Sequence, residues 1–298
     1  MDVFREFVVI ALLMVLVLAA CAPRSQPIPD HLNPPAVIDD FNEAMPGQPG
    51  SPWYLAGIDG GGEFLASQED HAAAWVIDDE NLRLMVFNDE SFDSEKSNDG
   101  KGKPAPSQYN NVFLVGFRGY APTQTEDIVI SSRMKIGCEN GFWGSTGIWM
   151  EEQNTFDQAG MGLKDFHAFG FSYLGRSAEG IAGLQFEAVD MGSYFFKHQR
   201  IEGINPCQWH TYSMRWGWQA DGRKQWVTYS IDDQELGAMV FPAFREAGEV
   251  QVWDDNYYIP TLIPFIGLPM RFEYQNIPKG MVQTALYDWV SVEVQPSQ

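Results

Sequence analysis

Apolar and polar residues alternate over short runs through most of the chain after residue 22. Alternation with a period of two places side chains on the two faces of a β-strand, and the period of 3.6 that marks an amphipathic helix is hard to find. Gly, Pro, Asn and Asp bound these runs at intervals typical of a β-sandwich. The pattern predicts an all-β, two-sheet antiparallel β-sandwich, with strands at residues 82–87, 111–117, 128–136, 166–174, 209–216, 226–231, 269–276 and 287–294.

Two polar stretches between these runs predict turns. Residues 232–235 (DDQE) separate two apolar runs and predict the turn of a β-hairpin. Residues 93–108 are polar and contain Gly and Pro, which predicts an exposed loop.

The composition excludes several classes of protein. The 298 residues are 45% hydrophobic and 20% charged, which excludes a disordered, collagen-like or coiled-coil protein. The length suits one large all-β domain, which we expect over residues 36–296. The net charge of −21 disfavours nucleic acid and other polyanions, so an uncharged partner such as a neutral polysaccharide is favoured by elimination.

The N-terminus predicts export. Residues 7–20 form an uncharged apolar run of fourteen, too short for a helix that spans a hydrocarbon core of about 30 Å. The run ends in Leu18-Ala19-Ala20-Cys21, which resembles the lipobox of bacterial lipoproteins. That resemblance implies a signal peptide over residues 1–20, a lipid on Cys21, a Pro-rich tether over residues 21–35, and an extracytoplasmic domain at the bacterial cell envelope. The alternative is an uncleaved anchor, because the region before the run carries little positive charge.

Export changes how the other two cysteines are interpreted, because thiols outside the cytoplasm can persist as disulfides. Cys138 closes the apolar run 128–136, and Cys207 opens the run 209–216. Antiparallel pairing of those two strands would bring the cysteines together. We expect a Cys138–Cys207 disulfide, and the alternative is two buried free thiols.

Several segments together resemble the concanavalin A-like jelly roll and, within it, the family-16 glycoside hydrolases. Residues 37–42 (VIDDFN), followed by Trp53, resemble the opening of that family, and residues 79–84 (DENLRL) resemble its next strand motif. Residues 132–136 (SRMKI), 141–143 (GFW) and 148–150 (IWM) resemble its E-A-R-I-K-x-P and G-L-W-P-A-F-W-L segments, and residues 209–216 (WHTYSMRW) are similar to its F-H-T-Y-A-I-E-W strand. The resemblance covers about residues 37–295 and implies a jelly-roll fold and a polysaccharide partner.

The chemistry of that family lies on one strand, E-x-D-x-(x)-E, where residues two apart point to the same face. One carboxylate attacks the anomeric carbon, a second protonates the leaving oxygen, and the middle Asp tunes both. The matching strand here is 166–174, and Ala168, Gly170 and Ser172 occupy the three positions. None of these side chains can act as an acid or as a carboxylate nucleophile.

Other carboxylates are candidates to replace them. Glu187 and Asp190 are three residues apart, which places them on opposite faces of a strand. Glu273 alternates with Arg271 and Gln275 and would form a polar row that faces the binding groove. Two adjacent acids, at positions 151 and 152, are expected on a loop surface.

Other catalytic chemistries have no sequence support. The chain contains no G-x-S-x-G, no H-E-x-x-H and no Gly-rich phosphate loop, and its five His show no metal-ligand spacing. We expect His210 to be a packed, hydrogen-bonded residue.

Aromatic residues are the remaining candidates for binding, because the C–H faces of sugar rings stack on indole and phenol rings. We expect Trp143, Trp253, Tyr257 and Tyr258 to lie in exposed loops and to contact a glycan. Four other tryptophans are expected in the sandwich core: Trp149, Trp216, Trp226 and Trp289.

The family resemblance further implies a structural Ca²⁺ where the first and last strands meet, at Asp40 and Asp288 with backbone carbonyls near Gly60. The alternative is two surface aspartates. No other cofactor is expected, and we expect a monomer.

Two functions remain open at this point: a non-catalytic polysaccharide-binding lipoprotein, or a glycosidase with displaced carboxylates such as Glu187 or Glu273. A structural or adhesion module is a third.

Overall fold

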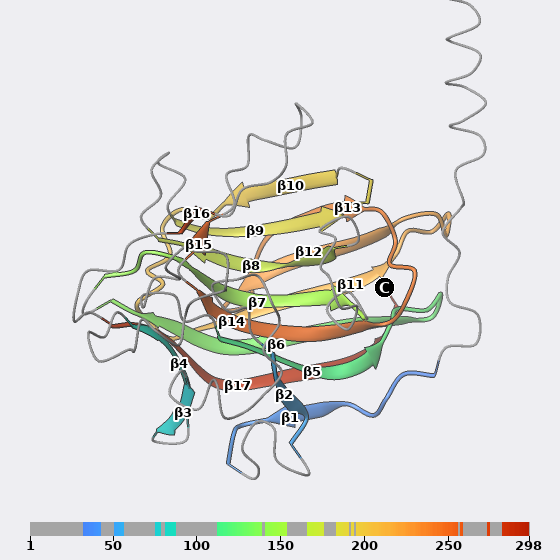
Figure 1. Ribbon diagram of the computed structural model, residues 1–298. Helices are drawn as coiled ribbons and strands as arrows, with labels where there is room; N and C mark the ends of the chain where they lie inside the picture. Colours follow the sequence, from blue (N-terminus) through green and yellow to red (C-terminus); the bar gives the residue numbers. More distant parts are fainter. Residues whose placement is uncertain are drawn as a thin grey trace, which may run out of the picture.

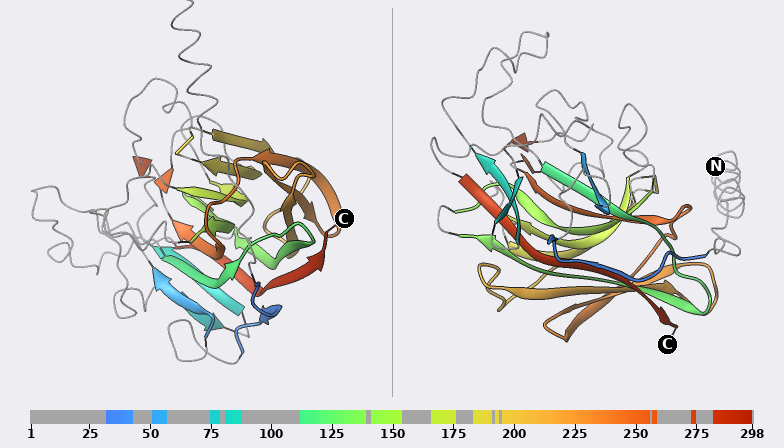
Figure 2. Two further views of the ribbon diagram at one scale, coloured as in Figure 1. Left: turned by 90° about the vertical axis from the view of Figure 1, so that its right-hand side faces the viewer. Right: turned by 90° about the horizontal axis from the view of Figure 1, so that it is seen from below.

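The structure is a computed structural model of two antiparallel β-sheets, one packed on the other (Figures 1 and 2). It describes residues 32–42, 51–56, 75–78, 81–87, 112–138, 141–153, 166–175, 183–190, 192–193, 195–255, 257–258, 273–274 and 282–297. None of these described residues forms a helix, so the predicted all-β sandwich is confirmed.

Sheet A contains eight strands in the order β13-β12-β11-β6-β17-β4-β3, with β1 paired to β17. Their bounds are β1 Val37–Asp39, β3 Trp75–Asp78, β4 Asn81–Phe87, β6 Glu126–Gly137, β11 His210–Trp218, β12 Gln225–Ile231, β13 Gln234–Phe241 and β17 Val282–Pro296. The strands β12 and β13 form the hairpin predicted at residues 232–235. Its turn residues Asp232 and Asp233 have φ of 49° and 65°, the left-handed conformation that tight hairpin turns require.

Sheet B contains seven strands in the order β10-β9-β8-β7-β14-β5-β2. Their bounds are β2 Trp53–Ala56, β5 Val112–Tyr120, β7 Ser145–Glu152, β8 His167–Leu174, β9 Gly183–Asp190, β10 Phe195–Arg200 and β14 Gly248–Asp255. A separate pair joins β15 Tyr257–Tyr258 to β16 Glu273–Tyr274. The strand predicted at residues 269–276 is described only at β16, and the loop predicted at residues 93–108 lies outside the described residues.

The hydrophobic core lies between the two sheets. Alternate residues of β8, Phe169 and Phe171, point towards sheet A and are fully buried. The ring centroid of Phe169 lies 5.3 Å from that of Trp216, and the centroid of Phe171 lies 5.2 Å from that of Tyr212. The side chains at the inward positions of both sheets are large and apolar, and they interdigitate to form the core. The outer face of each sheet carries the alternate residues of its strands.

Residues 33–35, the end of the expected tether, are held against the sandwich. Ala121 N donates a hydrogen bond to Asn33 Oδ1 at 2.9 Å, and Tyr120 Oη donates one to Pro35 O at 2.6 Å. Contact with the sandwich therefore begins at Asn33, three residues before the boundary expected from the sequence. None of the described residues forms a helix long and apolar enough to span a membrane, and residues 1–31, with Cys21, lie outside the described residues.

Candidate functional site

The outer face of sheet B, which points away from sheet A, holds the positions that the sequence analysis singled out. Since Phe169 and Phe171 point inward, strand alternation turns Ala168, Gly170 and Ser172 outward. The two neighbouring strands, β7 and β9, place further polar side chains on the same face.

One cross-strand row runs across this face. Glu187 of β9 lies opposite Gly170 of β8, Gly170 opposite Trp149 of β7, and Trp149 opposite Gln251 of β14. Side chains in such a row are neighbours, with Cβ atoms about 5 Å apart from one strand to the next. A carboxyl group, an indole ring and an amide therefore stand side by side.

Trp149 occupies the space over Gly170. A Cβ atom built on Gly170 would lie 2.2 Å from Trp149 Cδ1 and 2.2 Å from Ile148 O, so only glycine fits. The expectation that Trp149 lies in the core is wrong, because its neighbours Ile148 and Met150 take the inward positions.

Trp253 is also placed differently from the sequence prediction. It belongs to strand β14 rather than to a loop, and only 2% of its surface is exposed. Its ring centroid lies 4.3 Å from that of Trp149. Its indole also covers Gly147, where a Cβ would lie 2.8 Å from Trp253 Cη2. Burial under its neighbours removes Trp253 as an exposed sugar contact.

Glu187 is a buried carboxyl group on this face, and its burial shifts its pKa. It is 5% exposed, and burial raises its pKa to about 7, against the opposing effect of the polar groups of Ser172, Gln185 and Trp149. Gln185 Nε2 donates a hydrogen bond to Glu187 Oε2 at 3.0 Å. The carboxyl group therefore holds its proton over a large part of the range below neutral pH.

Three buried polar atoms on this face make no hydrogen bond of normal geometry: Ser172 Oγ, Trp149 Nε1 and Gln251 Oε1. The first two still lie close enough to the Glu187 carboxyl group to lower its pKa. They come from the adjacent strands β8, β7 and β14. A buried polar group without a partner is costly, so such groups require an explanation. A hydroxyl group, an indole N–H and an amide oxygen on neighbouring strands thus have hydrogen-bonding capacity that the surrounding protein does not fill with well-formed bonds.

The acids at positions 151 and 152 were expected on a loop surface, and this prediction is wrong. Both belong to β7 and are buried. Glu151 lies on the outer face opposite Glu249 of β14, whose Oε2 is 2.6 Å from Arg118 Nε. Glu152 points inward, where its carboxylate lies 3.1 Å from His167 Nδ1 and accepts a hydrogen bond from Glu246 N at 2.8 Å.

The other predicted site residues are not brought together on this face. Trp143 is half-buried just before β7, and its backbone N–H donates to Gln283 Oε1 at 3.0 Å. Tyr257 and Tyr258 form strand β15, so the prediction that they lie in a loop is wrong, and the backbone of Glu273 lies in its partner strand β16. Arg271 and Gln275 lie outside the described residues.

The two aspartates expected to bind Ca²⁺ have protein partners. Asp288 Oδ2 lies 2.5 Å from Arg133 Nη1, and Asp40 Oδ1 accepts a hydrogen bond from Asn42 N at 3.3 Å. Within the described ranges no group of three acidic, His or Cys side chains could hold a metal ion. The carbonyls near Gly60 lie outside these ranges.

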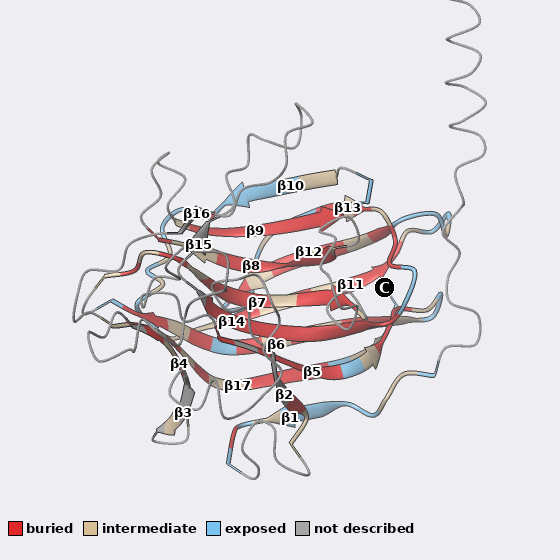
Figure 3. Cartoon of the chain, in the orientation of Figure 1, coloured by how far each residue is buried: buried red, intermediate tan, exposed pale blue. Residues whose placement is uncertain are grey.

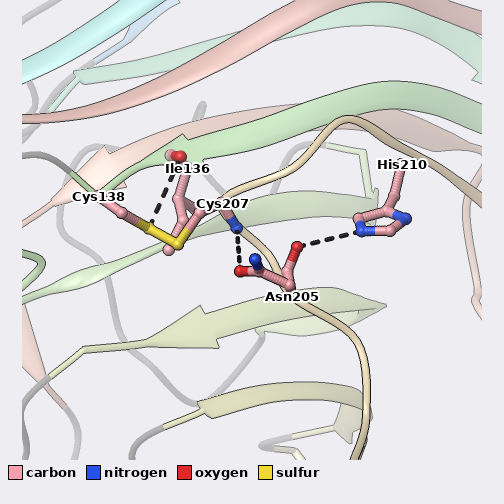
Figure 4. The surroundings of a disulfide bond; sticks show 5 residues. All are labelled: Ile136, Cys138, Asn205, Cys207 and His210. Atoms are coloured by element: carbon pink, nitrogen blue, oxygen red, sulfur yellow. Dashed lines mark hydrogen bonds between the residues drawn. A yellow bond between two sulfur atoms is a disulfide. The ribbon is translucent and has the colours of Figure 1, made fainter.

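Cys138 and Cys207 form a disulfide with a Cα–Cα distance of 5.7 Å (Figure 4). The strands β6 and β11 pair antiparallel, so the end of one meets the start of the other. His210 is hydrogen-bonded, as expected: Nδ1 lies 2.6 Å from Asp232 Oδ2, and Nε2 lies 3.1 Å from Asn205 O. This cluster lies at sheet A and does not contribute to the outer face of sheet B.

Comparison with known proteins identifies the architecture. The chain is similar to a β-glucanase from Bacillus licheniformis, at 14% identity and a TM-score of 0.52 over 88% of this chain and 99% of that one. An endo-1,3-β-glucanase from Streptomyces sioyaensis gives 12% identity and a TM-score of 0.58 over 89% and 97%. The protein has the jelly-roll fold of these glucanases.

A κ-carrageenase from Pseudoalteromonas carrageenovora is similar at 12% identity and a TM-score of 0.51, over 90% of this chain and 99% of the other. No protein-family model and no curated protein sequence matches the chain. At these identities the likeness establishes the fold alone, so function has to be argued from the residues of the outer face.

Sequence reasoning missed Trp149, Gln185 and Gln251 as members of this face. The signal that could have found Trp149 is the alternation in β7, where Ile148 and Met150 are the apolar inward pair. Gln251 follows the same rule in β14, between the core residues Val250 and Val252.

Proposed function

We propose that the protein binds a neutral polysaccharide on the outer face of sheet B and does not hydrolyse it. The observation that carries the proposal is the set of three buried polar atoms that make no hydrogen bond of normal geometry, Ser172 Oγ, Trp149 Nε1 and Gln251 Oε1, on adjacent strands. Sugar hydroxyls both donate and accept hydrogen bonds, so a glycan can satisfy all three atoms at once.

Trp149 supplies the apolar part of this recognition. Its indole is half-buried, in contrast to the fully buried Ser172 and Gln251 beside it. The exposed part of an indole ring is a surface on which the C–H face of a sugar ring can stack. Access to the face is therefore expected along Trp149 and towards β10, whose residues 197–200 are exposed (Figure 3).

The outward residues of β8 are the reason to expect no hydrolysis. Ala168, Gly170 and Ser172 are the outward residues of the strand that resembles the catalytic strand of family-16 glycoside hydrolases, and none of them carries a carboxyl group. Glycoside hydrolysis of this type needs an acid and a second carboxylate on either side of one bond. Removing even one of the two lowers the rate by orders of magnitude.

The test combines a binding assay with an activity assay. Native gel retardation with laminarin and with mixed-linkage glucan is expected to show binding, while a reducing-sugar assay shows no release of chain ends. Trp149→Ala is expected to weaken retardation at least fivefold, since it removes a stacking surface and one hydrogen-bond donor.

Trp226→Ala is the matched control, because this half-buried tryptophan lies in β12 of the other sheet. Equal losses in both variants would contradict the proposed face. Gln251→Leu is a second variant that removes a hydrogen-bonding group without opening a cavity.

A glycoside hydrolase is the second candidate function, and the environment of Glu187 favours it. A carboxyl group whose pKa is raised to about 7 by burial has the property required of a general acid. Glu151 of β7 is another described carboxyl group on this face, and strand β8 separates it from Glu187 of β9. The Cα atoms of Glu151 and Glu187 are therefore about 10 Å or more apart. Reducing ends that appear with the wild type and disappear with Glu187→Gln would establish this function and overturn the first.

The proposal extends to the location of the protein. A lipid on Cys21, following the lipobox-like residues 18–21, would hold the domain outside the cytoplasm on a bacterial membrane. We propose that the domain acts there as a monomer. A structural Ca²⁺ near Asp40 and Asp288 would require Asp288 to give up its pairing with Arg133.

A further inference from the structure

The edge strand of sheet B carries a concentration of basic residues that is unusual for this chain. Strand β10 has the sequence FFKHQR, with no acidic residue, whereas the whole chain contains 40 acidic and 19 basic residues. Its residues 197–200 are all exposed (Figure 3). A strongly acidic protein thus has two basic residues and a histidine on the edge strand next to its candidate binding face.

Two of these three side chains belong to that face. His198 lies opposite Glu187, and Arg200 lies opposite Gln185, so both side chains extend the outer face of sheet B by one strand. The ring of Phe196, on the same side, lies 5.2 Å from that of His198. Lys197 alternates with them and points to the other side of β10.

The guanidinium group of Arg200 is available to a ligand. Its side chain is 55% exposed, and Nε lies 3.0 Å from Glu202 Oε1, whose side chain is 79% exposed. An ion pair between two exposed side chains contributes little to stability, so an anion on a ligand can replace Glu202. The guanidinium group binds carboxylates and sulfate-like anions through two parallel hydrogen bonds.

The neighbouring carboxyl group opposes such an anion only weakly at slightly acidic pH. Burial raises the pKa of Glu187 to about 7, so the group is about half ionised at that pH and largely uncharged a unit or more below it. The negative charge of the rest of the molecule is screened over about 8 Å at physiological ionic strength, so contacts at β10 decide local binding.

We infer that His198 and Arg200 form a subsite for an anionic group on the bound polysaccharide, either a carboxylate or a sulfate ester. This inference rests on the proposed binding function and amends it: the polysaccharide is neutral along most of its length, and one sugar unit at this subsite carries a negative charge. Charged residues on an edge strand also prevent pairing with other chains, and that role makes no distinction between the two sides of β10.

The experiment measures dissociation constants for laminarin, carboxymethylated laminarin and sulfated laminarin, at low and at physiological ionic strength. The wild type is expected to bind at least one derivative about fivefold more tightly than laminarin, an advantage that decreases with added salt. Comparison of the two derivatives distinguishes a carboxylate from a sulfate. Arg200→Gln and His198→Ala are expected to bind the derivative and laminarin equally well.

Lys197→Gln is the matched control, because it removes one positive charge from the same strand on its other side. The control is expected to retain the preference for the derivative. Loss of the preference in the control would show a diffuse charge effect and overturn the subsite, as would equal binding of all three polymers by the wild type. If no polymer binds, the proposed function fails, and the subsite fails with it.

Discussion

At the residue scale, the outer face of sheet B is determined by how small and large side chains combine. Gly170 has space for no Cβ, because Trp149 and the carbonyl oxygen of Ile148 lie against it. Ser172, two residues along the same strand, has a hydroxyl group that lies near the Glu187 carboxyl group but makes no hydrogen bond of normal geometry. Strand β8 therefore has no space for an added methyl group at position 170, whereas we expect it to tolerate loss of the hydroxyl group at position 172.

Gly170→Ala is expected to lower the free energy of unfolding by about 1–3 kcal/mol, because the added Cβ displaces Trp149 or separates β7 from β8. Chemical denaturation of the variant measures this change. Ser172→Ala is the matched control on the same face and should change stability by less than about 0.5 kcal/mol, since its hydroxyl makes no hydrogen bond of normal geometry. A variant at position 170 as stable as the wild type would show that Trp149 does not cover the glycine.

The raised pKa of Glu187 predicts that the free energy of unfolding decreases as the pH rises. Its pKa is raised from 4.5 to about 7 on folding, so the folded state binds its proton more tightly than the unfolded state. The contribution of Glu187 to stability is therefore complete below about pH 4.5, falls as the pH rises to 7, and is constant above that. The total loss is roughly 3 kcal/mol.

The difference in unfolding free energy between wild type and Glu187→Gln isolates this effect, because the other titrating groups are common to both proteins. Denaturant unfolding at several pH values from 4 to 8 should show the wild type losing stability relative to the variant as the pH rises. A difference that is independent of pH would show that Glu187 is ionised as readily in the folded protein as in the unfolded chain.

At the scale of elements, the disulfide joins two strands that also pair through their backbones. Ile136 N donates a hydrogen bond to Pro206 O at 2.9 Å, and Cys207 N donates one to Asn205 Oδ1 at 3.2 Å. The loop before β11 is thus positioned by several bonds at once. The disulfide is expected to act mainly on the unfolded chain, by closing a loop whose ends are 69 residues apart.

Replacing both Cys138 and Cys207 by Ser is expected to reduce the free energy of unfolding by about 4 kcal/mol in the chain-entropy model. Thermal and denaturant unfolding measure the change, and reduction of the wild type should reproduce it. Cys21→Ser is the control, because it removes the cysteine outside the disulfide. An unchanged midpoint in the double variant would contradict the expected role of the bond.

At the scale of the whole molecule, the sandwich begins at Asn33, which is bonded to Ala121, and only eleven residues separate Asn33 from Cys21. An extended chain of that length reaches at most about 40 Å. A lipid on Cys21 would therefore keep the end of the sandwich near Tyr120 close to the membrane surface.

Cys21→Ser is expected to move the protein from the membrane fraction to the soluble fraction, or to stop its processing with an increase in apparent mass. Fractionation and immunoblotting measure both outcomes. The double variant at Cys138 and Cys207 should remain in the membrane fraction. If Cys21→Ser changes neither fractionation nor mass, the protein is not anchored through this residue.

Local pattern was sufficient to predict the all-β class, the hairpin at residues 232–235 and the alternation of β8. These features depend on neighbours in sequence, since a strand turns successive side chains to opposite faces whatever its partners are. The same alternation places Ala168, Gly170 and Ser172 together on one face, which the structure shows to be the outer face of sheet B.

Only the tertiary structure decided what stands beside that face. The sequence predicted Trp149 in the core and Trp253 in an exposed loop, yet Trp149 is half-buried over Gly170 and Trp253 is fully buried against Trp149. Glu187, Gly170, Trp149 and Gln251 form a row because β9, β8, β7 and β14 are neighbours, and β14 comes from a distant part of the chain. Sheet order and the depth of burial depend on long-range pairing, which residues within one strand do not encode.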